Sequence, residues 1–164
     1  MAKNRKNIQV ELDDIDRRIL HALQQDGRLT VAELAEKVGL SASPCHRRIK
    51  LLETRGVIDR YAAVVNQRVV GLPVSVFVSI KLESQREDAL AKFAKAIAPW
   101  PEILECYLMT GQRDYLLRVV VADLQAYEQF LKTKLTRLSG ISSIESSFAL
   151  EQVKYSNSLP LFSV

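Results

Sequence analysis

Hydrophobic residues in the first third of the chain recur every three or four positions, in blocks separated by polar residues and glycines. The first block predicts a helix from Asp14 to Gln25, capped by Asp13. The second block predicts a helix that begins after Thr30, where Glu33 completes a capping box, and that stops at Gly39. Two short helices joined by a tight turn are therefore expected at the start of the chain.

A third helix is predicted directly after Gly39, with Ser41 as its N-cap and Pro44 in its first turn. Its apolar positions fall on one side and predict a buried stripe of Cys45, Ile49 and Leu52. The opposite side carries hydroxyl, imidazole and cationic groups. Two helices joined by a glycine-containing turn, the second with a polar and basic outer face, are typical of a helix-turn-helix.

The outer face of this third helix has the chemistry of a DNA-reading surface. A helix fits the major groove, where residues near its N-terminus reach base edges. We expect Arg47 or His46 to contact a base edge, and Arg48 and Lys50 to contact phosphates. The candidate DNA-binding residues are Ser41, Ser43, His46, Arg47, Arg48 and Lys50. The alternative for any single cation is a solvated surface charge.

The pattern changes after residue 56. Residues 57–66 are β-prone and predict a short wing strand that leads into a linker. The predicted organisation is a winged helix-turn-helix domain over residues 1–62, a linker over 63–73, a second domain over 74–153 and a C-terminal tail over 154–164.

The second domain repeats a strand-helix-strand pattern. Its predicted elements are strand, helix, strand, strand, helix and strand at residues 74–83, 90–97, 103–110, 115–121, 124–138 and 141–153. This βαββαβ order predicts a ferredoxin-like sandwich, so the whole chain belongs to the α+β class. Both helices would cover one sheet face, and apolar residues on the other predict a homodimer through this domain.

Composition and charge narrow the choice of partner. The chain is 48% hydrophobic and 26% charged, as a folded globular protein is, and its net charge is +4. The first 62 residues carry +3 of this charge and the remainder +1, which favours a polyanion as the partner of the first domain, although a solubility role fits equally well. No apolar run is long enough for a membrane span, and no secretory signal is apparent. Two cysteines, both predicted to be buried and without metal-like spacing, suit a reduced, cytoplasmic protein.

Four stretches of the chain resemble the Lrp/AsnC (leucine-responsive/asparagine-regulator) family. They read LDDIDRRIL at 12–20, GLS at 39–41, RIKLLE with GVI at 48–58, and GQRDY at 111–115. The resemblance implies a prokaryotic transcription regulator that binds double-stranded DNA through the first domain and an amino acid or related metabolite through the second. It also implies dimers that assemble further, commonly to octamers, with the effector held between dimers near residues 110–115.

The loop at residues 111–115 departs from the family's usual Gly-Asp-Xaa-Asp-Tyr pattern, because Gln112 replaces the first acid and a cation follows. Its groups nevertheless suit a zwitterion. Gly111 allows close approach, Arg113 can bind a carboxylate and Asp114 an ammonium group. The candidate effector-binding residues are Gly111, Arg113, Asp114, Tyr115, Ser146 and Ser147. The alternative is an ordinary hairpin turn in which Asp114 is a cap.

Two other functions compete with a ligand-modulated regulator. One is an architectural protein that organises DNA with little effector control. The other is an enzyme, since some proteins resembling this family decarboxylate tetrapyrroles with histidines and arginines around a cavity. His21 and His46 both lie in the first domain, and no catalytic triad, phosphate loop or metal motif is present. We therefore expect neither enzymatic activity nor a metal or cofactor, apart from the amino-acid effector.

Overall fold

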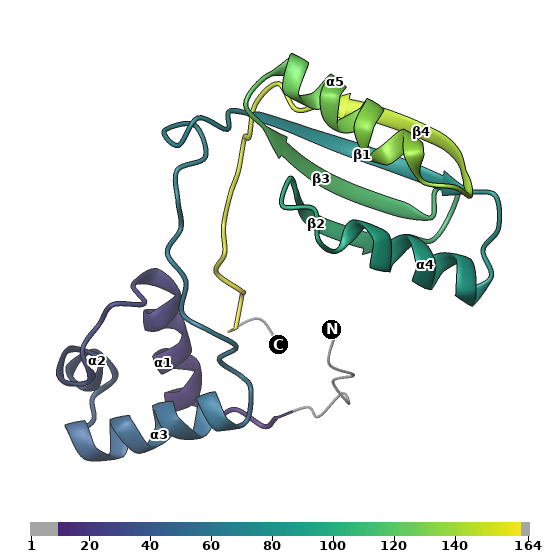
Figure 1. The fold of residues 1–164 in the computed structure, drawn as a ribbon. Coiled ribbons are helices and arrows are strands. Elements are labelled where there is room, and N and C mark those ends of the chain that lie inside the picture. Colours follow the sequence, from purple (N-terminus) through teal and green to yellow (C-terminus); the bar gives the residue numbers. More distant parts are fainter. Residues whose placement is uncertain (1–9, 162–164) are drawn as a thin grey trace. The chain divides into compact units, whose positions relative to one another are not determined.

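The computed structural model describes residues 10–161, and the chain within this range forms two compact units (Figure 1). The first unit comprises the described parts of residues 1–64 and 154–164, and the second comprises residues 65–153. Residues 154–161 thus belong to the same unit as residues 10–64. The chain passes from one unit to the other twice, after Val64 and again after Val153.

Helices α1 (Asp14–Gln25), α2 (Val31–Val38) and α3 (Ala42–Thr54) build the first unit, as the sequence predicts. Asp13 caps α1 by accepting a hydrogen bond from the backbone N–H of Asp16 at 2.8 Å. Each helix turns its apolar side inward, so that their buried side chains form one small core. The fully or nearly buried members are Ile19, Leu20, Leu34, Ala35, Val38, Cys45, Ile49 and Leu52.

The two ends of α2 and the start of α3 are formed as the sequence predicts, with one exception. The Thr30 hydroxyl and the Glu33 carboxylate form the reciprocal capping box at the start of α2. Gly39 ends α2 with a left-handed φ of 72°, which a residue with a side chain rarely adopts. Ser41 holds the N-cap position of α3, but its side chain makes no capping hydrogen bond.

The predicted wing is wrong. Residues 55–73, all of them described, contain no strand and consist of turns and irregular backbone. The β-prone side chains there lack a neighbouring strand with which to pair, and several are largely exposed, including Val64 and Val65. The first unit is therefore a helix-turn-helix without a wing, and the α+β class of the whole chain is unaffected.

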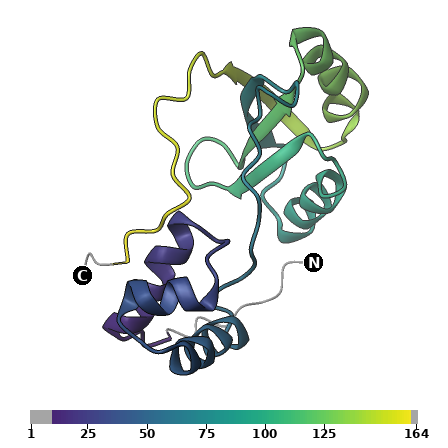
Figure 2. The ribbon, with the colours of Figure 1, turned by 90° about the vertical axis from the view of Figure 1, so that its left-hand side faces the viewer.

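The second unit has the predicted ferredoxin-like order. Its elements are β1 (Val74–Leu82), α4 (Glu87–Ile97), β2 (Ile103–Leu108), β3 (Tyr115–Val121), α5 (Leu124–Thr133), the 3₁₀-helix η1 (Leu135–Arg137) and β4 (Ile141–Phe148). The four antiparallel strands lie in the order β2-β3-β1-β4. Both α-helices lie on one face of the sheet (Figures 1 and 2), and together they bury alternate residues of β1 and β3.

The opposite sheet face carries no helix of this unit within the described chain. Its central residues include Phe77, which is 39% exposed, opposite Arg118 on β3. Arg118 forms an ion pair with Glu105 at 2.9 Å and donates a second hydrogen bond to Gln67. The face therefore combines apolar surface with an ordered polar network, and we call it the open sheet face.

Three local expectations need correction. β4 ends at Phe148 rather than Val153; in this register the first residue of β1, Val74, falls opposite position 150, so residues 151–153 have no residue of β1 with which to pair. The predicted helix over 124–138 breaks after Thr133, where η1 continues it with a tighter turn. Cys106 is exposed on edge strand β2, whereas Cys45 is buried as expected.

Candidate DNA-binding and effector sites

The outer face of α3 presents the groups that the sequence assigns to DNA. Ser43, His46, Arg47 and Lys50 are all exposed, and their i, i+3, i+4, i+7 spacing places them in one row along the helix. On the inner side, Cys45, Ile49 and Leu52 are at most 8% exposed. The apolar stripe thus fixes which face of α3 is turned to solvent.

Lys50 is partly engaged within its own helix. Its ammonium group lies 2.8 Å from a carboxylate oxygen of Glu53, whose other oxygen accepts a hydrogen bond from the Tyr61 hydroxyl at 3.2 Å. The hydrogen bond from Lys50 is the main cause that lowers the pKa of Glu53. Such an exposed pair is weak, so it leaves the Lys50 side chain able to turn toward a phosphate.

Arg48 does not share the exposed row, and its pairing inside the domain argues against its predicted role as a phosphate contact. Its guanidinium lies 2.7 Å from the carboxylate of Asp13 and 2.7 Å from that of Asp16, both near the start of α1. The hydrogen bond to Asp16 and then that to Asp13 raise the pKa of the guanidinium. Arg48 therefore joins α3 to α1 within the domain, and we call these three residues the Arg48 clamp.

Asp13 and Asp16 were missed as partners because the sequence marks the start of α1 only as a cap. Their i, i+3 spacing places both carboxylates on one side of the first turn. A pair of acids on one helix and an arginine at a half-buried position of another is a signal that sequence reasoning can use. The structure describes this pairing directly.

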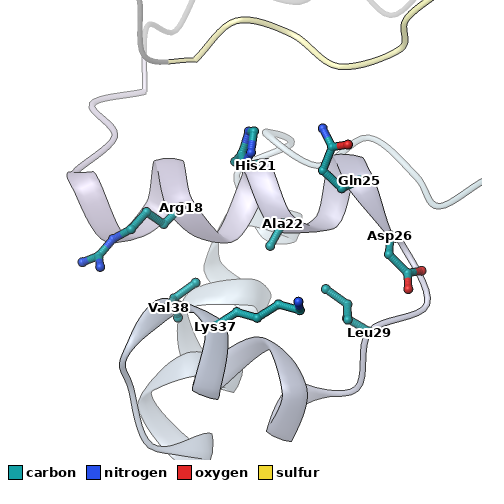
Figure 3. Close-up of a pocket in the computed structure, with 8 residues that line it drawn as sticks. All are labelled: Arg18, His21, Ala22, Gln25, Asp26, Leu29, Lys37 and Val38. Atoms are coloured by element: carbon teal, nitrogen blue, oxygen red, sulfur yellow. The ribbon is translucent and has the colours of Figure 1, made fainter.

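A groove of about 350 Å³ lies between α1 and α2 in the same domain (Figure 3). Its floor is apolar, with Ala22, Leu29 and Val38, and polar side chains stand around the rim. The Arg18 guanidinium and the Asp26 carboxylate lie at opposite ends of the groove. The groove contains none of the predicted DNA-binding residues, and its polar groups do not converge on one point.

In the second unit, Asp114 is buried rather than open to a ligand, with only 4% of its surface exposed. Its carboxylate accepts hydrogen bonds from the backbone N–H of Leu82 at 2.7 Å and from the Gln85 amide at 2.7 Å. The Lys81 ammonium lies 3.3 Å away. Burial opposes ionisation, but these three partners outweigh it, so the pKa of Asp114 falls below its usual value.

These contacts argue against the expectation that Asp114 binds an ammonium group of the effector, since its oxygens already accept hydrogen bonds at the end of β1. Tyr115 is likewise internal. It is 5% exposed, its hydroxyl donates to the backbone carbonyl of Leu90 at 3.0 Å, and its ring packs 4.7 Å from that of Phe93. Both residues thus anchor the loop through contacts on its buried side.

The other residues of the loop face outward. Gly111 has a φ of 105°, and no heavy atom beyond its two chain neighbours lies within 4 Å of the place where a Cβ would stand. Arg113 donates a hydrogen bond to the Ser143 hydroxyl at 2.8 Å and forms an ion pair with Glu145. Ser143 and Glu145 lie on β4 opposite Lys81 and Ser79, on the open sheet face. Sequence reasoning missed both of these partners.

Ser146 and Ser147 do not form a pair of ligand hydroxyls. Successive residues of a strand point to opposite faces, and Ser146 lies on the helix-covered face, where it shares a hydrogen bond with the Tyr127 hydroxyl. Ser147 lies on the open sheet face, opposite Phe77. The structure therefore brings Arg113 together with Ser143 and Glu145, buries Asp114 and Tyr115, and turns Ser146 toward the helices.

Neither a metal site nor a membrane span is found in the described chain. Residues 10–161 contain no cluster of three or more His, Cys, Asp or Glu side chains arranged to hold a metal ion. Within the same residues, no helix is both long enough and apolar enough to cross a bilayer.

Comparison with known proteins decides the family. Residues 12–53 match the AsnC-type helix-turn-helix domain, and residues 75–159 match the Lrp/AsnC ligand binding domain. This chain belongs to the Lrp/AsnC family. Like its relatives, it is a DNA-binding transcription regulator that combines a helix-turn-helix with a ligand-binding domain.

Similar regulators cover nearly the whole chain. The Bkd operon transcriptional regulator of Pseudomonas aeruginosa is 46% identical over 92% of this chain and 99% of its own length. The leucine-responsive regulatory protein of Escherichia coli K12 is 40% identical over 97% of both chains. The crystal structure of a Neisseria meningitidis transcriptional regulator, NMB0573, in complex with L-methionine has a TM-score of 0.88 and 40% identity, covering 93% of this chain and 98% of that one.

Asp114→Ala is expected to destabilise the second domain by about 3 kcal/mol, because it leaves the buried Leu82 N–H without an acceptor and Lys81 without its counter-ion. Urea unfolding followed by Trp100 fluorescence measures this, since Trp100, the one tryptophan in the sequence, packs on the core of that domain. Arg113→Ala on the same loop is the control and should cost less than about 1 kcal/mol. Equal stability of Asp114→Ala and the unmodified chain would contradict the stabilising role of these Asp114 contacts.

The same carboxylate predicts a pH dependence. Its pKa in the folded state lies below the ordinary value of 3.8, so its stabilisation is present above that pH and is lost as the pH falls toward the folded-state pKa. The stability difference between the unmodified chain and Asp114→Asn should therefore shrink as the pH is lowered below about 4. A difference that stays constant down to pH 2.5 would show that Asp114 is not the group responsible.

Proposed function

We propose that this regulator reads DNA with the exposed row on α3 and that an amino acid bound at the second domain modulates this activity. The observation that carries the proposal is the row itself. Ser43, His46, Arg47 and Lys50 face solvent together on a helix whose other side is fixed in the domain core. A helix presented in this way can enter the major groove without rearrangement.

The exposed residues divide into two roles. Arg47 and His46 lie in the first half of α3 and reach base edges, and Arg47 has the fork geometry that suits guanine. Ser43 reads beside them, while Lys50 and the hydroxyl of Ser41 contact phosphates, which add affinity and set the register. Arg48 contributes indirectly, because its clamp holds α3 against α1.

A homodimer formed through the open sheet face supplies two reading helices. The apolar surface around Phe77 is then covered by the same face of a second copy, as a two-fold axis requires. Two reading helices related by this axis match a palindromic site with half-sites about one helical turn apart. Further association of dimers to an octamer, in the cytoplasm, follows the pattern that the family resemblance implies.

An amino acid is the effector that the outward-facing loop groups suit. Arg113 offers a guanidinium to a carboxylate, Glu145 offers a carboxylate to an ammonium group, and Gly111 leaves space beside the backbone. The two charged groups pair with each other in this structure, so a zwitterion would replace one ion pair by two. The methionine complex of the Neisseria regulator makes L-methionine the first candidate, and the leucine-responsive relatives make L-leucine the second.

Arg47→Ala should reduce discrimination between a selected operator and random DNA by about 1–3 kcal/mol, as expected for loss of a bidentate base contact. The operator is first obtained by selection from a random DNA library, and both affinities are then measured by fluorescence anisotropy. Lys50→Ala is the matched control and should weaken both DNAs alike. An equal loss on both DNAs for Arg47→Ala would make Arg47 a phosphate contact.

Addition of L-methionine or L-leucine should raise the thermal midpoint of the protein and change its operator affinity. A ligand that binds the folded state at 100 times its Kd stabilises it by about 2.7 kcal/mol. All twenty amino acids are screened by thermal shift, and Arg113→Ala should lose the response of whichever amino acid acts. If the affinity for the operator were the same in the presence of each of the twenty amino acids, the protein would instead be an architectural DNA-organising protein.

A further inference from the structure

The C-terminal segment of the chain has a specific seat on α1, outside the reading face. The Gln24 side-chain amide pairs with the backbone of Leu159 in both directions, accepting from its N–H at 2.6 Å and donating to its carbonyl at 3.3 Å. Arg17, two turns earlier on α1, donates to the carbonyl of Leu161 at 2.6 Å. The segment therefore runs antiparallel to α1.

Two further features strengthen the contact between this segment and α1. The side chain of Leu161 packs against the helical core of the first unit, and Gln25 donates a hydrogen bond to the Ser158 hydroxyl at 3.4 Å. Pro160 lies between the two anchored leucines and has no N–H that would need a partner. It also favours an extended conformation at Leu159, which lowers the entropy lost on seating.

The seat gives the reading domain a second attachment to the rest of the chain. One connection leaves α3 and reaches β1 through residues 55–73. The other leaves β4, passes through residues 149–157 and ends on α1. β4 is also the strand whose Ser143 and Glu145 hold Arg113 of the outward-facing loop.

We propose that the segment Ser158–Leu161 is a tether that restricts the range of orientations open to each reading domain in the dimer. The inference rests on the proposed dimeric reading of DNA. A domain held by one linker samples a wide volume, whereas a domain held at both ends samples a narrower one. With both domains restricted, binding of the first half-site raises the effective concentration of the second domain at the other half-site.

The tether should affect binding to DNA with two half-sites more than binding to DNA with one half-site. Deletion of residues 158–164 removes the seat, and it should weaken binding to a fragment with two half-sites by roughly 10-fold, which is a loss of part of the avidity. Binding to a fragment with one half-site should stay within about twofold, because the reading face of α3 is untouched. Both affinities are measured by fluorescence anisotropy at one salt concentration.

Point variants separate the seat from other effects of a deletion, such as changed assembly. Gln24→Ala keeps the full chain and removes the paired amide, so it should move the two-site affinity in the same direction. Arg18→Ala is the matched control, since it alters an exposed neighbour on α1 whose side chain makes none of the contacts described for the segment. Equal loss on both DNAs, or no loss on either in the deletion variant, would overturn the tether.

Small-angle X-ray scattering of the unmodified chain and the deletion variant gives a readout that needs no DNA. The variant should show a broader distribution of interatomic distances, and an unchanged distribution would overturn the proposal. If the unmodified chain bound neither DNA, the proposed function would fail while the scattering comparison still decided whether the segment restrains the domain.

Discussion

The arrangement of the DNA-reading unit depends on how α3 is held from behind. The buried stripe of Cys45, Ile49 and Leu52 fixes the rotation of the helix, and Arg48, in the middle of α3, pairs with two carboxylates at the start of α1. Arg48 is adjacent in sequence to Arg47, yet successive helical residues point about 100° apart. One arginine is therefore half-buried and paired within the domain while the other faces solvent, and this separation affects which side chains are available to DNA.

In the second unit, the negatively charged Asp114 has a supporting role like that of the positively charged Arg48 in the first. The buried carboxylate of Asp114 gathers the end of β1 and the following turn, and it thereby fixes the backbone from which Gly111 and Arg113 project. In both units a charged side chain that looks like a ligand contact in the sequence supports the site from inside. The groups left for partners are the exposed row on α3 and the outward side of the loop next to β4.

The helices, strands and their order could be predicted from the sequence, because hydrophobic period, caps and glycines are local signals. The wing failed for the opposite reason: residues 57–66 have β propensity, but a strand requires a neighbour that the sequence does not identify. Side-chain roles failed where pairing is long-range, as for Arg48 with Asp16 or Arg113 with Glu145. Ser146 and Ser147 are the exception, since the two-residue period of a strand already places them on opposite faces.

Salt dependence of operator binding tests most directly whether α3 reads DNA while Arg48 holds it from behind. Affinity is measured from low to high salt for the unmodified chain, Arg48→Ala and Lys50→Ala. Each lost phosphate contact lowers the magnitude of the log–log slope by about 0.9. The account predicts that Lys50→Ala loses about this much, whereas Arg48→Ala binds more weakly with an unchanged slope. A slope that falls by about 0.9 in Arg48→Ala would show that Arg48 contacts the phosphate backbone and contradict the clamp.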